Sequence, residues 1–295
     1  MRSARFSIGV RHMAASAVLF SLMSLLVKLA GHRLPSHQIV LVRAVICLVL
    51  SIGWLRLARV SLWGANRRLL VLRGVLGTCS LICFYYSLVH LPFAEAVVIQ
   101  YLSPVLTAVL AAALLAERPS PRLLGALACS VGGVIAIARP AILFGGAAAD
   151  LAPWGVAAAL VGSLLTALVF VLVRGLGDRE DPLTVVFYFP LCAVPLVTPL
   201  AIPVWVWPTP LEWLILAGVG VATQLAQVSM TRGLMLEPAG RASAVGYLQV
   251  VLAGTWGALF FDEIPDLASL AGALLIVGAT LALTLDKPAM VDQPT

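Results

Sequence analysis

The chain has 295 residues, of which 61% are hydrophobic and 11% are charged, with a formal net charge of +6 at pH 7 and a mean hydropathy of +1.05. This composition carries more apolar surface than one water-soluble core can bury. It excludes an ordinary soluble globular protein and indicates an all-α integral membrane protein.

Ten mostly apolar segments follow one another along the chain. Each is close to the roughly 20 residues that an α-helix needs to cross the hydrocarbon core while satisfying its backbone hydrogen bonds internally. We expect transmembrane helices at residues 12–30, 36–55, 69–89, 93–116, 122–138, 154–176, 182–204, 211–234, 240–261 and 267–285. The seventh segment is the weakest prediction, because Pro190, Pro195 and Pro199 interrupt it.

The first apolar segment follows Arg2, Arg5 and Arg11, an arrangement that also begins a signal peptide. Its apolar run is longer than the usual hydrophobic region of about 7–15 residues, and no Ala-x-Ala-like cleavage site precedes a soluble domain. We therefore expect this segment to remain in the protein as a membrane helix.

The distribution of Lys and Arg between the connections predicts the orientation. With the N-terminus inside, the cytoplasmic side holds fifteen of the 19 basic residues. They are Arg2, Arg5, Arg11, Arg56, Arg59, Arg67, Arg68, Arg73, Arg118, Arg122, Arg174, Arg179, Arg232, Arg241 and Lys287. Both termini are therefore expected in the cytoplasm, and the positive charge is expected to face lipid headgroups, with no nucleic acid as a partner.

Two stretches of the chain resemble each other. YLSPVLTAVLAAALLAERP at 101–119 matches YLQVVLAGTWGALFFDEIP at 247–265, and the same offset of 146 residues pairs Pro92 with Pro238 and Gly132 with Gly278. Matching segments are five helices apart, an odd number, so the second copy is expected to cross the membrane in the opposite direction. This predicts two five-helix inverted repeats, at 1–143 and 144–295, a plan that recurs in secondary transporters.

These features together resemble a known family. Arg73-Gly74 opens the third segment, and the fourth has the form P-x-x-x-A…Y-L-x-P…A-x-x-x-x-E-R-P before a Gly-rich fifth segment. This pattern is similar to the EamA family of the drug/metabolite transporter superfamily, which includes amino-acid exporters of the YddG type. The resemblance implies ten helices around a central cavity lined mainly by the first, third, fourth, sixth, eighth and ninth, and the export of small metabolites.

The second copy departs from the pattern at one point. Ser103-Pro104 in the fourth segment is replaced by Gln249-Val250 in the ninth. A proline inside a membrane helix removes a backbone hydrogen bond and permits a bend. Pro104 is therefore our candidate gating residue, and this role cannot be transferred to the ninth segment.

Polar side chains inside the apolar segments are the candidate substrate-binding residues, because such groups usually face the interior of a helix bundle. The alternative is that they are interhelical hydrogen bonds worth about 0.6 kcal/mol each. Lys28 is included as a candidate partner for a substrate carboxylate, with Arg43 as a weaker one. The predicted set is Tyr85, Tyr86, Gln100, Tyr101, Ser103, Ser163, Thr166, Gln224, Gln227, Tyr247, Gln249 and Lys28.

The ionisable residues and cysteines argue against other chemistry. Acidic residues lie at helix ends, so a buried acidic relay for protons is not supported, and Glu117 and Glu263 are predicted to be structural or to handle a proton at a helix end. The histidines and cysteines show no metal-ligand spacing, and there is no nucleotide-binding loop. We expect no enzyme activity, no cofactor and no metal site.

The sequence thus predicts a multi-pass protein of a bacterial inner membrane that exports small metabolites by alternating access without ATP. Tyrosine combines an apolar ring with a hydroxyl, which suits amino acids, including aromatic ones, as substrates. The alternative substrates are other amphiphilic metabolites or drugs. An intramembrane enzyme and a membrane scaffold are more distant alternatives, and assembly as a homodimer remains open.

Overall fold

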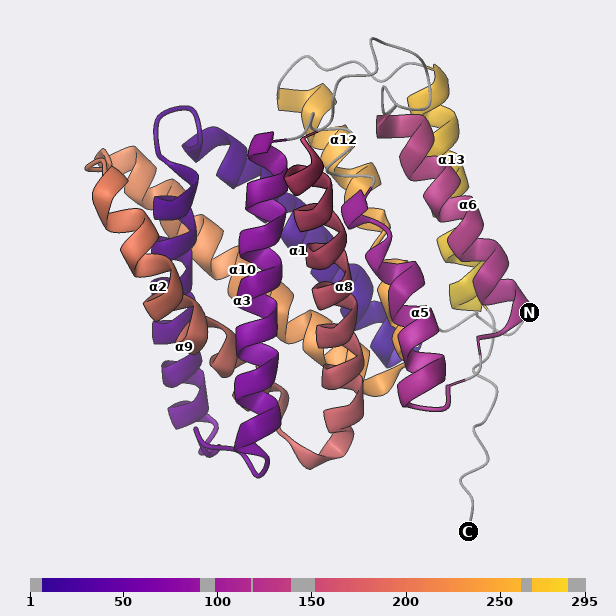
Figure 1. Ribbon diagram of the computed structural model, residues 1–295, viewed down its shortest axis with the longest axis horizontal. Helices are drawn as coiled ribbons and strands as arrows, with labels where there is room; N and C mark the ends of the chain where they lie inside the picture. The colour runs from indigo at the N-terminus through magenta and orange to yellow at the C-terminus, as the bar shows by residue number, and fades with distance from the viewer. Residues whose placement is uncertain (1–6, 91–98, 118, 139–151, 261–266, 286–295) are drawn as a thin grey trace.

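The computed structural model describes residues 7–90, 99–117, 119–138, 152–260 and 267–285, and all regular secondary structure in these ranges is helical (Figure 1). The first half contains α1 (Ile8–Ala30), α2 (Ser36–Leu57), α3 (Arg67–His90), α5 (Ser103–Leu114) and α6 (Pro121–Ala138). The second half contains α8 (Pro153–Leu176), α9 (Pro182–Ala201), α10 (Pro210–Leu236), α11 (Ala239–Val245), α12 (Leu248–Phe260) and α13 (Leu267–Leu285), with 3₁₀ turns η1 (Gly177–Arg179) and η2 (Ile202–Val204).

The described helices agree with the predicted segments to within a few residues, with two exceptions. The fourth segment is described only from residue 99, and a turn at 101–102 precedes α5. The ninth segment is divided into α11 and α12 by a turn at 246–247. Within the described residues, α1, α2, α3, α8, α9 and α10 are long and apolar enough to span a bilayer, while α5, α6 and α13 contain shorter apolar runs. The chain is therefore a multi-pass membrane protein.

Side-chain caps mark the start of three helices, α1, α9 and α10. The Ser7 hydroxyl accepts a hydrogen bond from the Val10 amide at the start of α1, and Asp181 does the same for Leu183 at the start of α9. Thr209 and Glu212 form a reciprocal capping box at the start of α10. Despite its three internal prolines, α9 continues as one helix to Ala201.

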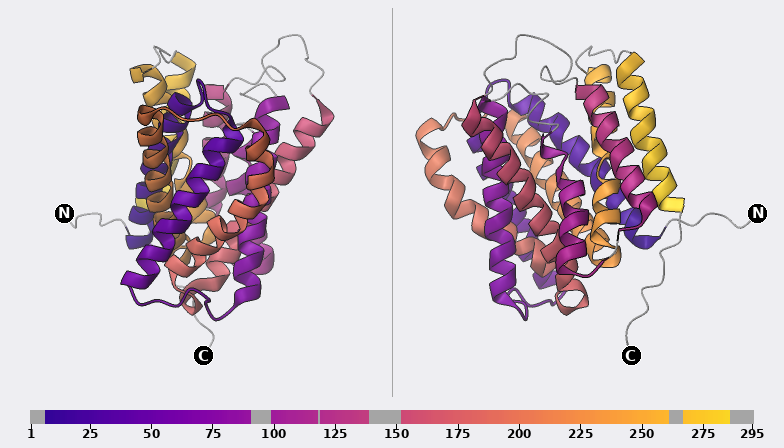
Figure 2. Two further views of the ribbon diagram at one scale, coloured as in Figure 1. Left: turned by 90° about the vertical axis from the view of Figure 1, so that its left-hand side faces the viewer. Right: turned by 45° about the vertical axis from the view of Figure 1, so that its right-hand side comes forward.

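The helices pack mainly as pairs drawn from the two halves. α1 packs on α10 and α8 on α3, while α2 pairs with α9 and α6 with α13. Figure 1 shows α2 and α9 at one edge and α6 and α13 at the other. The views of Figure 2 show the same helices from two further directions. Five helices of the second half, α8, α9, α10, α12 and α13, start and end about 146 residues after α1, α2, α3, α5 and α6, the separation that also joins Tyr101 and Tyr247.

The contact of α6 with α13 depends on close backbone approach at one glycine. A Cβ added at Gly133 would lie 2.6 Å from the carbonyl oxygen of Gly272, whereas one added at neighbouring Gly132 would meet nothing within 4 Å. Gly133 is buried and Gly132 is exposed. Small residues allow such close packing between membrane helices.

We expect Gly133→Ala to lower the stability of the protein by about 1–3 kcal/mol, because the added methyl group forces α6 and α13 apart. Gly132→Ala is the matched control, since alanine also favours the helix there and meets no neighbour. The measurement is the apparent melting temperature of the detergent-solubilised protein, followed by loss of the monodisperse gel-filtration peak on heating. Equal melting temperatures for the two variants would contradict the packing described for α6 and α13.

Candidate functional site

Two predicted residues meet where their helices are interrupted. The rings of Tyr101, before α5, and Tyr247, before α12, are stacked with their centroids 5.7 Å apart. The Tyr247 hydroxyl donates a hydrogen bond of 2.7 Å to the Tyr101 carbonyl oxygen, and the Tyr247 side chain is fully buried. The two tyrosines of the predicted repeat, 146 residues apart in sequence, are thus in direct contact.

The backbone at both interruptions is held by short-range hydrogen bonds. The amides of Leu102 and Tyr247 donate to the carbonyl oxygens of Ile99 and Ala244, which is the 3₁₀ pattern. Pro104 lies in the first turn of α5, directly after the interruption. At that position the missing N–H costs little, because the first amides of a helix have no intrahelical acceptor. Pro104 therefore follows a break in the helix, where the sequence had indicated a bend within a continuous one.

A second group of polar side chains joins α3, α8 and the residue before Tyr101. The hydroxyl oxygens of Ser80 and Thr166 are 2.6 Å apart, and the Gln100 amide nitrogen donates to the Thr166 hydroxyl at 3.2 Å. The Gln100 side-chain oxygen is buried and has no partner. Sequence reasoning selected Gln100 and Thr166 and missed Ser80, although a polar residue within the third apolar segment was a visible signal.

A third group lies where α3 meets α9 and α10. The Arg73 guanidinium is 1% exposed and donates from Nη2 to the Gln227 side-chain oxygen at 3.1 Å. The Phe189 ring centroid lies 5.2 Å from the Arg73 Cζ atom, within the range of a cation–π contact. The positive-inside count had treated Arg73 as a residue at the cytoplasmic boundary. The structure places it among packed helices, about two turns into α3.

The remaining predicted residues are more scattered. Gln224 is buried and donates to the Ser51 hydroxyl at 2.8 Å, and the Ser163 hydroxyl donates to the Leu160 carbonyl of its own helix. Tyr85 packs against apolar residues of α2 and α9. Tyr86 is 42% exposed and stacks on His90, away from the other groups. Ser103 is buried, Gln249 is half-buried, and the side chain of Lys28 lies outside the described residues.

One end of the bundle, which we call the Ser7 end, is held together by contacts of charged side chains. Glu117 accepts hydrogen bonds from Arg174 Nε at 2.8 Å and from the Ala239 amide at 2.9 Å. Arg174 also donates to the Met235 carbonyl oxygen at 2.6 Å. Glu117 therefore has two structural partners, Arg174 and a backbone amide. Arg118 and Glu263 lie outside the described residues.

The opposite end, which we call the Arg33 end, is held by other contacts. Arg33 forms an ion pair with Glu212, and this hydrogen bond raises the pKa of the Arg33 guanidinium. The Gln38 side chain bonds both backbone polar groups of Val206, donating to its oxygen at 2.6 Å and accepting from its nitrogen at 2.8 Å. Both ends are thus fastened by contacts between segments far apart in sequence.

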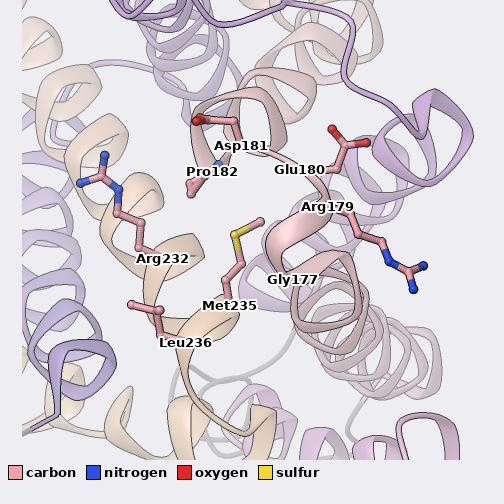
Figure 3. Close-up of a pocket in the computed structure, with 8 residues that line it drawn as sticks. All are labelled: Gly177, Arg179, Glu180, Asp181, Pro182, Arg232, Met235 and Leu236. Atoms are coloured by element: carbon pink, nitrogen blue, oxygen red, sulfur yellow. The ribbon is translucent and has the colours of Figure 1, made fainter. Parts of the chain in front are cut away.

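A pocket of about 470 Å³ opens at the Ser7 end. Figure 3 shows its lining residues, which come from the connection between α8 and α9 and from the end of α10. None of the predicted substrate-binding residues lines it. Its acids already have partners, because Asp181 caps α9 and Glu180 accepts hydrogen bonds from the amides of Ala65 and Asn66. We therefore assign this pocket no binding role.

Comparison with known proteins identifies relatives. The model of the EamA-like transporter family matches twice, at residues 7–139 and 153–285. The chain is similar to the pseudopaline exporter CntI of Pseudomonas aeruginosa, with 32% identity over 95% of this chain and 96% of that protein. It is also similar to human solute carrier family 35 member G1, with 29% identity over 95% and 80% of the two chains.

More distant relatives extend this comparison. The S-adenosylmethionine uptake transporter of Rickettsia prowazekii is 22% identical over 72% of this chain and 69% of that protein. A crystal structure superposes with a TM-score of 0.82 and 22% identity, covering 95% of this chain and 98% of the other. This last similarity establishes a shared fold.

We expect Tyr247→Phe to lower stability by about 0.5–1.5 kcal/mol, because it leaves the Tyr101 carbonyl oxygen without its buried donor. Tyr101→Phe is the matched control, since it removes a hydroxyl from the stacked pair and keeps the carbonyl that accepts the bond. The melting temperatures of the two purified variants are compared with the wild type. A larger loss in Tyr101→Phe would contradict the assigned hydrogen bond.

Proposed function

Because the chain belongs to the EamA-like transporter family, we propose that this membrane transporter exports small metabolites with both an apolar and a charged part, amino acids including aromatic ones among them. The observation that carries this proposal is the meeting of polar residues from both halves at two interrupted helices. Interrupted membrane helices expose backbone polar groups only where protein or a water-lined cavity can satisfy them. The partly exposed Tyr101 ring, stacked on the buried Tyr247 ring, offers an apolar surface beside those groups.

The proposal includes a duplication, with residues 1–143 and 144–295 forming inverted five-helix repeats. It is supported by the two matches to the family model and by the constant offset between corresponding helices. The contacts between helices also correspond, because α3 packs on α9 as α10 packs on α2, and α5 packs on α8 as α12 packs on α1. This arrangement predicts ten membrane-spanning helices, with both termini in the cytoplasm.

Alternating access is the mechanism that we propose for this arrangement. The Ser7 end would face the cytoplasm, and the contacts of Glu117 with Arg174 and Ala239 would form a gate there. These contacts join the segment that follows α5 to α8 and α11, so opening this end requires that they break. The transport cycle would then exchange this closure for one at the Arg33 end.

The relatives bear on the direction of transport and on the membrane. The pseudopaline exporter supports export and a bacterial inner membrane, whereas the S-adenosylmethionine uptake transporter shows that related chains also import. The alternative is an exporter of other amphiphilic metabolites or drugs. A homodimer remains a prediction.

The proposed function predicts saturable counterflow of labelled amino acids in proteoliposomes, measured with and without a pH gradient. Tyr101→Ala should abolish it, because the variant removes one ring of the stacked pair at the centre of the site. Trp154→Ala, which removes an exposed aromatic side chain of α8, is the control and should transport normally. If no amino acid moves while a lipophilic cation or another metabolite does, the proposed substrates are wrong and the transporter assignment remains.

The proposed gate predicts that charge reversal at either partner impairs transport and that the double exchange restores much of it. Glu117→Arg or Arg174→Glu alone places like charges together and should reduce counterflow of L-phenylalanine about tenfold or more. The double variant re-forms the ion pair and should recover most of the loss, though not all, because the Ala239 amide still lacks its acceptor. A double variant no more active than either single variant would exclude the pair as a gate.

A further inference from the structure

Arg73 is a fully buried cation with unused hydrogen-bonding capacity. Its guanidinium has one hydrogen-bonded partner, the Gln227 side-chain oxygen, and the Phe189 ring covers it. The Nε and Nη1 atoms are buried and have no partner. In the described part of the chain, no salt bridge reaches Arg73. Glu212, Glu117 and Glu237 there pair with Arg33, Arg174 and Arg241, and Glu180 and Asp181 accept hydrogen bonds from backbone amides.

An unpaired charge in this position is costly. Moving an ionised side chain out of water without an opposite charge costs several kcal/mol, and an arginine cannot escape this by losing its proton. An apolar residue of similar volume would fill the same space without this cost. Neither the Gln227 amide nor the Phe189 ring supplies a negative charge, so the site is electrostatically incomplete.

The usual roles of arginine in membrane proteins do not fit this position. Arg67 and Arg68 at the start of the same helix are exposed, as expected for residues that face lipid headgroups. Arg73 is instead enclosed by α9. Two glycines permit this approach, because a Cβ at Gly74 would lie 2.5 Å from the Tyr188 carbonyl oxygen and one at Gly77 would lie 3.0 Å from the Phe189 ring.

We propose that Arg73 binds the carboxylate of the transported substrate, an inference that rests on the proposed function. A guanidinium forms strong, directional hydrogen bonds with a carboxylate, and the bond to Gln227 holds it in a fixed orientation. A single monoanion neutralises this single cation, whereas a phosphate dianion would leave a negative charge buried. The Phe189 ring beside the guanidinium would contact the apolar part of the same substrate.

The test measures binding of L-phenylalanine and of L-phenylalaninamide, which lacks the carboxylate, to the purified full-length protein by isothermal titration calorimetry. The wild type should bind the acid about 30-fold or more tightly than the amide. Arg73→Met should weaken binding of the acid about 30-fold and change binding of the amide less than about threefold. Retained binding of the amide also shows that the variant is folded.

Two further variants complete the experiment. Arg68→Met removes the same charge from an exposed position of α3 and should leave both affinities unchanged. Arg73→Lys keeps the charge without the planar donor set, so it should weaken binding of the acid about fivefold and leave the amide unaffected. If Arg73→Met does not fold, Arg73→Lys decides, and equal effects on both probes, or none on either, would overturn the inference.

The outcomes separate this inference from the proposed function. A wild type that binds both probes equally, or an Arg73→Met variant that keeps the wild-type preference for the acid, overturns the role of Arg73 and leaves amino-acid transport standing. A wild type that binds neither probe and shows no counterflow of any amino acid overturns the proposed substrates, and the role of Arg73 with them.

Discussion

The hydrocarbon core of a bilayer offers no water, and this constraint governs the whole structure, because every buried polar group must find its partner within the protein. A continuous helix satisfies this constraint by itself, because its backbone groups bond one another. Interrupted helices do not, and the interruptions at Tyr101 and Tyr247 persist because each is held by local 3₁₀ bonds and by the bond between them. The same contact that satisfies the backbone also joins the two halves of the chain. The hydrogen bond between Tyr247 and Tyr101 therefore stabilises the fold and also lies at the candidate site.

If the two halves are related by the proposed duplication, both ends of the bundle meet this constraint with different residues at corresponding positions. Gln38 and Thr184 are separated by the repeat offset, and each bonds a backbone group of a distant connection, Val206 for Gln38 and Ser61 for Thr184. Arg33 anchors one end through the side chain of Glu212, whereas Glu180, one position past its counterpart, anchors the other through the amides of Ala65 and Asn66. Under the proposed duplication, the backbone arrangement corresponds while the chemistry differs, so sequence identity alone would understate the similarity of the halves.

Apolar segments determine helix positions directly, so the sequence was sufficient to predict nearly all the described helix boundaries. It also identified which polar residues are unusual, but not their partners, since partners depend on how helices cross. Tyr85 and Tyr86 are adjacent and look equivalent in the sequence, yet one packs between helices and the other faces outward. Arg73 was assigned to the membrane boundary because charge counting ignores packing. The close approach of α9 at Gly74 and Gly77, which encloses it, has no signature that a single sequence reveals.

The two arginines buried in α2 and α3 show where the proposed symmetry ends. Arg43 and Phe189 are separated by the repeat offset, as are Arg73 and Val219. The contact of α3 with α9 thus pairs a guanidinium with an aromatic ring, whereas on the corresponding α2 the Arg43 Nη1 atom lies 3.7 Å from the Met23 sulfur. A site duplicated by symmetry would bind a substrate equally well from either side. Different side chains on equivalent backbones allow affinities and rates to differ between the two faces, while the substrate gradient or a coupled ion still sets the direction of net transport.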